Sequence, residues 1–292
     1  MREICFVGLG AMGMPMAAHL VAKGFQVRGY DRREAAMQAM VKQGGIEVAD
    51  LAAAAASADA LVLMVVNVEQ ARTVLFDEGA LDLLAPDASI ILMSTCPPAA
   101  VEALAQEVQS SGRVLIDCPV SGGIKGAEAA TLTLMVACED DQLERVRPIL
   151  SALGDKLFHV GQRPGQGAVV KSINQLLCGV HIAAAAEALS LGQKAGLDAA
   201  MLLEILGGSA ASSWMLRDRG QRMLEADPQV TSAVDIFVKD LGIVMEAGRD
   251  AKAALPLAAH AHQLFLAASG AGEGSKDDSR LIGVYHRMNS IT

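Results

Sequence analysis

Residues 4–13 read Ile-Cys-Phe-Val-Gly-Leu-Gly-Ala-Met-Gly, an apolar run followed by the pattern G-x-G-x-x-G. The apolar run predicts a buried strand. The glycines after it permit a tight turn, close approach of the backbone to a pyrophosphate, and close packing of the next helix. The free N–H groups at the start of that helix attract an anion. We therefore expect this segment to bind a dinucleotide through Gly8, Leu9, Gly10, Ala11, Met12 and Gly13.

An acidic residue follows the second predicted strand. Asp31 lies about twenty residues beyond the glycines, where a carboxylate that binds the adenosine ribose is expected. A carboxylate repels the 2′-phosphate of NADP and so favours NAD, although Arg32 and Arg33 could each pair with that phosphate. The alternative is an ordinary glycine turn followed by an acidic loop residue. The strand, the helix and Asp31 together favour NAD, with Asp31 and Arg32 as cofactor contacts.

The first half of the chain alternates strand-like and helix-like segments. Short apolar runs separated by helices predict a parallel sheet with helices on both faces, a doubly wound α/β domain of the Rossmann type. The expected strands are 4–7, 26–30, 60–66, 89–93, 114–116, 131–137 and 157–160. The expected helices are 12–23, 34–43, 68–76, 99–110 and 141–153.

The pattern changes near Gly161. Residues 161–167 carry three glycines and Pro164, as a linker does, and strand signals almost disappear after them. The following helices are expected at 169–195, 198–206, 212–225, 234–251, 256–269 and 277–286. The sequence thus predicts an NAD-binding domain over residues 1–162 and an all-α substrate and oligomerisation domain over residues 163–292, entered by a long helix.

A lysine and two carboxamides stand near this predicted domain junction. Lys171, Asn174 and Gln175 have the spacing i, i+3 and i+4, so they share one face of the long helix. Domain junctions are preferred ligand sites. The pattern also fits a solvated polar stripe on an exposed helix, and spacing alone does not decide between the two.

A second polar segment follows a strand at residues 117–123. Ser121 offers a hydroxyl, and Gly122 and Gly123 expose backbone N–H groups, so this loop can bind a carboxylate. A plain loop explains the same residues equally well.

Composition excludes several classes of function. The net charge of -9 and the absence of a basic tract argue against a nucleic-acid partner. The five cysteines are scattered, so neither a disulfide framework nor a metal site is expected. We find no membrane span and no signal peptide, and expect a cytoplasmic protein.

Taken together, the motifs resemble those of the β-hydroxyacid dehydrogenase family, which includes 3-hydroxyisobutyrate dehydrogenases. The resemblance covers essentially the whole chain. It rests on GLGAMGMPM (8–16), Ser94-Thr95, DCPVSGG (117–123), GQGAVVKSINQ (165–175) and Lys239-Asp240. Within the family the second half is most similar to L-threonate dehydrogenases, in the stretches 174–184, 213–215, 232–241 and 276–279. Val65-Val66-Asn67 adds to this similarity.

The resemblance also implies roles for single residues. Lys171 would be the catalytic acid–base group, and Ser121, Gly122 and Gly123 would bind the substrate carboxylate. Thr95 and Lys239 would lie near the nicotinamide, with Val66 and Asn67 as further cofactor contacts. Asn174 and Gln175 would meet the rest of the substrate. Family members commonly carry Asn-Asn after the lysine, so Gln175 puts the detailed polar contact in question.

The implied reaction is NAD-dependent oxidation of a small hydroxy acid, with L-threonate as the first candidate and its 2-oxo acid as product. Tartronate semialdehyde reduction, 3-hydroxyisobutyrate oxidation, an imine reductase-like activity and a non-catalytic dinucleotide-binding module are the alternatives. Imine reductases of this architecture lack a lysine at the catalytic position, so Lys171 argues against that activity. The alanine-rich long helix further predicts a homodimer or homotetramer.

Overall fold

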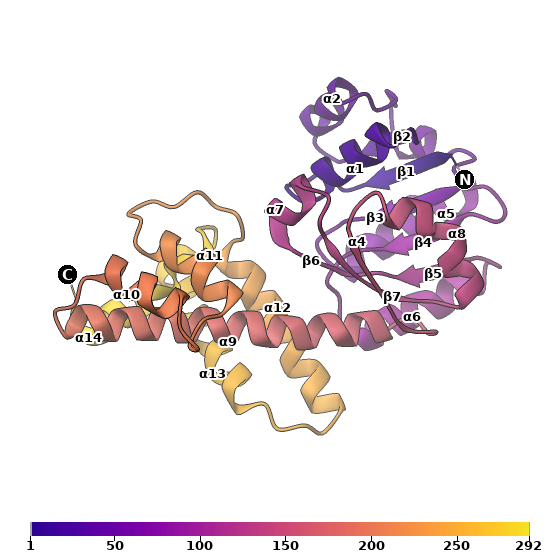
Figure 1. Cartoon of the computed structure of the whole chain (residues 1–292). Helices are drawn as coiled ribbons and strands as arrows, with labels where there is room; N and C mark the ends of the chain where they lie inside the picture. The colour runs from indigo at the N-terminus through magenta and orange to yellow at the C-terminus, as the bar shows by residue number, and fades with distance from the viewer. Residues whose placement is uncertain (1, 292) are drawn as a thin grey trace. The chain divides into compact units, whose positions relative to one another are not determined.

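The computed structural model describes residues 2–291. By its internal contacts the chain divides into two compact units, of which the first ends at Lys171 and the second begins at Ser172. The division falls inside one helix, α9 (Gln166–Lys194), drawn in Figure 1 as the longest helix.

The first unit is built on one sheet, whose strands run in the order β2-β1-β3-β4-β5-β7-β6, with β8 beside β7. The strands are β1 (Glu3–Val7), β2 (Gln26–Tyr30), β3 (Ala60–Leu63), β4 (Ser89–Leu92), β5 (Val114–Asp117), β6 (Val120–Ser121), β7 (Thr133–Ala137) and β8 (Lys156–Gly161). The pairs from β2 to β5 are parallel, which confirms the predicted fold class.

The expectation of a parallel sheet is wrong at one edge. There β7 runs antiparallel to both β5 and β6. After β6 the chain turns back through the short helix α7 (Gly123–Glu128) instead of crossing over the sheet. A parallel connection needs a longer crossover, which the chain makes only afterwards, through α8 (Asp140–Leu150) from β7 to β8.

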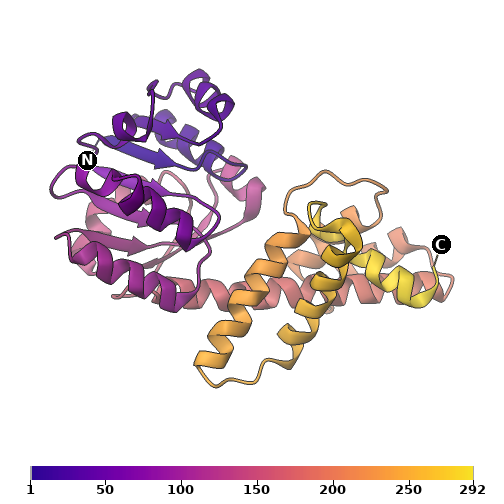
Figure 2. The same cartoon turned by 180° about the vertical axis from the view of Figure 1, so that it is seen from behind.

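Helices cover both faces of this sheet because its strands are apolar on both sides. In β1, Ile4 and Phe6 belong to one core, while Cys5 and Val7 belong to the other. The first core holds α1 (Gly13–Ala22), α2 (Glu34–Lys42) and α8. The second holds α3 (Leu51–Ala55), α4 (Val68–Arg72), α5 (Ala80–Leu83) and α6 (Pro98–Gln109). Figures 1 and 2 show these two layers from opposite sides.

The second unit is helical throughout its described residues, as predicted. With most of α9 it contains α10 (Ala199–Gly207), α11 (Trp214–Met223), α12 (Val234–Asp250), α13 (Pro256–Ala268) and α14 (Ile282–Asn289). Its core combines small residues of α9, among them Ala183 and Ala186, with the stacked rings of Phe237 and Phe265, 5.0 Å apart. By length and composition α9 could cross a membrane, but a buried core helix passes the same test.

A buried ionic cluster connects residues 277–278 to α11. Arg219 pairs with Asp278 at 3.0 Å and with Asp218 at 2.5 Å, and Arg222 lies 3.4 Å from Asp277. The carboxylates of Asp277 and Asp278 are fully buried, so they need these cations to offset their lost hydration. Residues 277–278 thus have a structural role in this unit.

Candidate active site

The glycine turn after β1 has the geometry that its sequence predicts. Gly8 adopts a left-handed φ of 97°, and a Cβ there would lie 2.3 Å from the carbonyl oxygen of Met64. A Cβ on Gly13 would lie 1.8 Å from the Gly8 oxygen, whereas a Cβ on Gly10 would meet nothing within 4 Å. Gly8 and Gly13 are therefore needed for packing, and the space at Gly10 lets a ligand approach the backbone. α1 has no side-chain cap, so no capping side chain covers the N-terminus of this helix, the end that attracts an anion.

Asp31 directly follows β2 and is hydrogen-bonded to the glycine turn. Its Oδ2 accepts a hydrogen bond from the Leu9 N–H at 2.9 Å, and the Arg33 guanidinium lies 2.9 Å from Oδ1. Burial opposes ionisation, but the hydrogen bonds from Arg33 and Leu9 outweigh it and lower the pKa of Asp31. Arg32, which is exposed, pairs with Glu78 at 3.2 Å. An ionised carboxylate beside the glycine turn is the arrangement that binds a ribose hydroxyl.

The other predicted cofactor contacts follow β3 and β4. β3 ends at Leu63, three residues before the predicted end, because the Val65 N–H donates to the side chain of Ser94 at 3.0 Å instead of continuing the sheet. Val66 is exposed, and Asn67 caps α4 by accepting from the Gln70 N–H at 2.9 Å. Thr95 is half-buried. These residues lie at the carboxyl ends of β3 and β4, on the same sheet edge as the glycine turn, where open α/β sheets bind ligands.

The predicted carboxylate-binding loop is more ordered than its sequence suggests. Ser121 belongs to β6, and Gly123 begins α7, so regular structure lies on either side of Gly122. Gly122 and Gly123 have positive φ values of 134° and 61°, which glycine adopts without strain. A Cβ on Gly123 would meet nothing within 4 Å, so its backbone is open to an approaching group.

The start of α9 is held by a buried carboxylate. Asp117 at the end of β5 accepts hydrogen bonds from the N–H groups of Gly165 at 2.8 Å and Ala168 at 3.0 Å. Burial raises the pKa of Asp117 to about 6, although these N–H groups pull it down. Lys171 follows one turn later, and its side chain is also buried. The backbone just before the predicted acid–base lysine is thus anchored to the central sheet.

Beyond Lys171, the carboxamides of α9 take part in a chain of polar contacts inside the second unit. Asn174 Nδ2 donates to Gln175 Oε1 at 2.9 Å, and Gln175 Nε2 donates to Asp240 Oδ2 at 2.5 Å. Lys239 Nζ lies 3.1 Å from Asp240 Oδ1. Lys171, Asn174 and Gln175 all lie in α9, where their spacing places them on one face. Asp240, noted from the sequence only as part of a motif, is a partner of Gln175.

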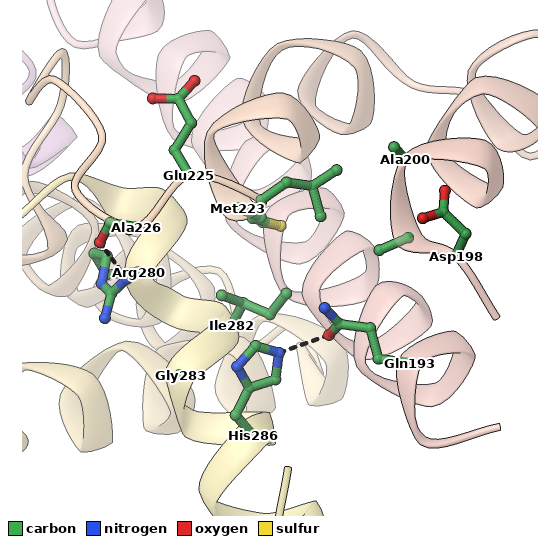
Figure 3. Close-up of a pocket in the computed structure, with 12 residues that line it drawn as sticks. Gln193, Asp198, Ala200, Met223, Glu225, Ala226, Arg280, Ile282, Gly283 and His286 are labelled. Carbon is green, nitrogen blue, oxygen red and sulfur yellow. Dashed lines mark hydrogen bonds between the residues drawn. The ribbon is translucent and has the colours of Figure 1, made fainter. Parts of the chain in front are cut away.

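The hollow shown in Figure 3 is separate from the predicted site residues. It measures about 440 Å³ in the second unit and includes none of the predicted site residues. Its polar groups bind one another: His286 pairs with Gln193 at 2.7 Å, and Arg280 donates to the Ala226 carbonyl at 3.2 Å.

Comparisons with known proteins find matches over both halves of the chain. Residues 3–161 match the family model described as the NAD binding domain of 6-phosphogluconate dehydrogenase. Residues 165–285 match the model described as NAD-binding of NADP-dependent 3-hydroxyisobutyrate dehydrogenase. Together the two models span almost all of the chain.

Individual relatives are similar over the same length. An L-threonate dehydrogenase from Cupriavidus necator is 40% identical over 97% of this chain and 96% of its own. A 2-(hydroxymethyl)glutarate dehydrogenase from Eubacterium barkeri is 36% identical over 99% of this chain and 97% of its own. A crystal structure of a 3-hydroxyisobutyrate dehydrogenase from Salmonella typhimurium matches with a TM-score of 0.91 at 37% identity, over 97% of this chain and 100% of that one. The chain belongs to the β-hydroxyacid dehydrogenase family and is an NAD(P)-dependent oxidoreductase.

Proposed function

We propose that this enzyme oxidises L-threonate at C2 to the 2-oxo acid, with NAD as the hydride acceptor and Lys171 as the base. The observation that carries the proposal is the buried Lys171, which shares one face of α9 with two carboxamides and follows a backbone segment anchored by Asp117. The names of the relatives support a hydroxy acid as substrate, and several of them, at 36–40% identity, are L-threonate dehydrogenases.

In this mechanism each group of the chain has a separate task. The hydroxyl of Ser121 and the N–H groups of Gly122 and Gly123 bind the substrate carboxylate. The Lys171 amine takes the proton of the reacting hydroxyl, and in the reverse direction its ammonium returns that proton to the oxygen. A nicotinamide bound beside Thr95 and Lys239, as proposed, would supply the acceptor for the hydride of the substrate carbon. The protein thus supplies alignment and proton transfer.

A preference for NAD follows from Asp31. Its carboxylate accepts the Leu9 N–H and is held by Arg33, so it is placed beside the glycine turn. An ionised carboxylate there accepts hydrogen bonds from ribose hydroxyls and repels a 2′-phosphate. The other proposed contacts around the adenosine half of NAD are Leu9, Ala11, Met12 and Arg32. Those near its nicotinamide half are Val66, Asn67, Thr95 and Lys239.

The polar character of Asn174 and Gln175 favours a hydroxylated substrate. Carboxamides bind hydroxyl groups, and a site built for hydroxyls rejects an analogue that leaves its polar groups unpaired. We therefore expect 3-hydroxyisobutyrate, with its apolar methyl group, to be a poor substrate. D-Glycerate, oxidised at C3 to tartronate semialdehyde, is the second candidate.

Steady-state kinetics test this proposal. The absorbance of reduced cofactor is followed with L-threonate, D-erythronate, D-glycerate and 3-hydroxyisobutyrate, each with NAD and with NADP. We expect the highest kcat/KM for L-threonate with NAD. Highest efficiency on 3-hydroxyisobutyrate would disprove the substrate, and NAD binding without turnover on any acid would indicate a non-catalytic dinucleotide-binding module.

We also propose a domain boundary near residue 162, a cytoplasmic location, and assembly as a homodimer or homotetramer. Exposed apolar side chains on α9 support assembly, because Ile173 and Leu177 are 58% and 49% exposed in the single chain. Light scattering coupled to size-exclusion chromatography measures the mass directly, and the mass of a monomer would contradict this assembly.

A further inference from the structure

Asp240 on α12 is a buried acidic side chain that no step of the proposed mechanism uses. It is 3% exposed. Its Oδ2 accepts from Gln175 Nε2 at 2.5 Å, a contact between residues 65 positions apart, and its Oδ1 faces the Lys239 ammonium at 3.1 Å. A buried carboxylate is costly without such partners, so its contacts are part of how the second unit is built.

The carboxylate determines which way the amide of Gln175 points. An ionised carboxylate only accepts hydrogen bonds, so it must face the NH₂ group of Gln175 and not the oxygen. The Gln175 oxygen is thereby turned toward Asn174, whose Nδ2 lies 2.9 Å away. An asparagine at position 175 would be one methylene shorter, and its amide could not hold both contacts at these distances.

The Gln175 oxygen in turn determines which way the amide of Asn174 points. Its Nδ2 donates to Gln175 Oε1 and, at 3.4 Å, to the sulfur of Cys178 on the next turn of α9. Both hydrogens of the amide are then in use, and Asn174 is only half-buried. The group that Asn174 can offer to a ligand is its carbonyl oxygen, Oδ1, which accepts hydrogen bonds.

We infer that Asp240 is a positioning residue: through Gln175 it turns Asn174 so that the amide oxygen, an acceptor, is presented to the substrate. A fixed acceptor at this position selects an acid that carries a hydroxyl beyond the reacting carbon, because the hydroxyl hydrogen has its partner there and a methyl group has none. An amide turned to present its NH₂ group could only donate to the hydroxyl oxygen and would leave the hydroxyl hydrogen unpaired. The inference rests on the proposed function, since it takes Asn174 to contact the substrate.

The test compares two acids that differ only in the hydroxyls that do not react. L-Threonate is compared with 2-hydroxybutanoate of the same configuration at C2. In Asp240→Asn the new amide can donate as well as accept, so Gln175 and then Asn174 can turn around. The ratio of the two kcat/KM values should fall about tenfold, which is the discrimination lost with one substrate hydrogen bond. A purely structural role would lower both values together and leave their ratio unchanged.

Two further variants test whether the effect of Asp240→Asn depends on its contact with Gln175. Asp235→Asn is the same replacement on the same helix, at an exposed carboxylate that binds Ser269 at 2.6 Å, and should leave the ratio unchanged. Gln175→Asn shortens the side chain by one methylene, so its amide no longer reaches Asp240. It should therefore lower the ratio of the two kcat/KM values as Asp240→Asn does. Adding Asp240→Asn to Gln175→Asn should have no further effect, because Asp240 acts through Gln175. Gln175→Asn decides the question if Asp240→Asn does not fold.

A second measurement does not depend on turnover. The side-chain amide protons of Gln175, observed by NMR, should shift in Asp240→Asn and stay in place in Asp235→Asn. Unshifted Gln175 protons, or an unchanged ratio in both Asp240→Asn and Gln175→Asn, would overturn the inference. If wild type oxidises no acid while the Gln175 protons shift as expected, the proposed function fails and the contact chain stands.

Discussion

The Oδ2 atom of Asp117 lies 2.8 Å from the backbone nitrogen of Gly165, so a carboxylate at the end of β5 holds the chain where α9 begins. This carboxyl group is buried, and burial raises its pKa from 3.8 to about 6. The folded state thus binds its proton more tightly than the unfolded state does. Its contribution to stability is complete below the unfolded pKa of 3.8 and is lost as the pH rises through about 6.

We expect this loss to be visible when wild type is compared with Asp117→Asn, which cannot titrate. The difference in unfolding free energy, wild type minus variant, should fall by about 2 kcal/mol between about pH 4.5 and about pH 7.5. Urea unfolding followed by circular dichroism measures it. A pH-independent difference for Asp117→Asn would contradict the assignment.

Lys171→Met tests the proton-transfer step. The variant should fold and bind NAD as wild type does, while kcat falls about 10²–10⁴-fold, the usual contribution of a general acid–base group. Stopped-flow or steady-state absorbance gives kcat, and fluorescence titration gives the Kd for the cofactor. Lys194→Met, the same replacement at the far end of α9, should keep full activity. A Lys171→Met rate above about a tenth of wild type would exclude this role.

Asp31→Ala should shift the enzyme toward NADP. The replacement removes the ribose contact and the repulsion of the 2′-phosphate, and it frees Arg33, now 2.9 Å from Asp31, to pair with that phosphate. The ratio of kcat/KM for NAD to that for NADP should fall at least about tenfold. The double variant Asp31→Ala/Arg33→Ala should gain less activity with NADP. A wild type that is already more efficient with NADP would refute the preference.

Gly10 and Gly13 form a matched pair because the same added methyl group meets different surroundings. In Gly10→Ala it enters open space, so stability should be kept while NAD binding weakens at least about tenfold. In Gly13→Ala it would lie 1.8 Å from the Gly8 oxygen, so stability should fall by about 1–3 kcal/mol. Thermal unfolding and NAD titration separate the two effects. Unchanged NAD affinity in Gly10→Ala would argue against the proposed pyrophosphate site.

Local sequence patterns predict most of the fold. The alternation of apolar runs and helices gives β1 to β5 and the longer helices around them, and the linker-like segment marks the change to a helical second half. The short elements α3, α5, β6 and α7 were missed because two to six residues carry no clear periodicity. The helix predicted over residues 68–76 is α4 followed by a π-helical turn at Thr73–Asp77, a change in winding that the apolar pattern does not reveal.

The site is predictable only where neighbours in the sequence are neighbours in space. The glycine turn and the spacing of Lys171, Asn174 and Gln175 meet this condition. Asp117 and Asp240 stand inside motifs noted from the sequence, but their partners lie 48 and 65 positions away. Such pairings depend on how strands and helices pack, which no local pattern encodes.

The placement of three site residues within little more than one turn of α9 has a consequence for the history of the family. Their spacing is set by the helix itself, so no loop has to be reshaped when one of them is exchanged. A descendant can replace the residues three and four positions after the lysine and accept a different acid while inheriting the proton-transfer group unchanged. Relatives named for L-threonate and for 2-(hydroxymethyl)glutarate, at 40% and 36% identity to this chain, show that proteins this similar to it are named for different acids.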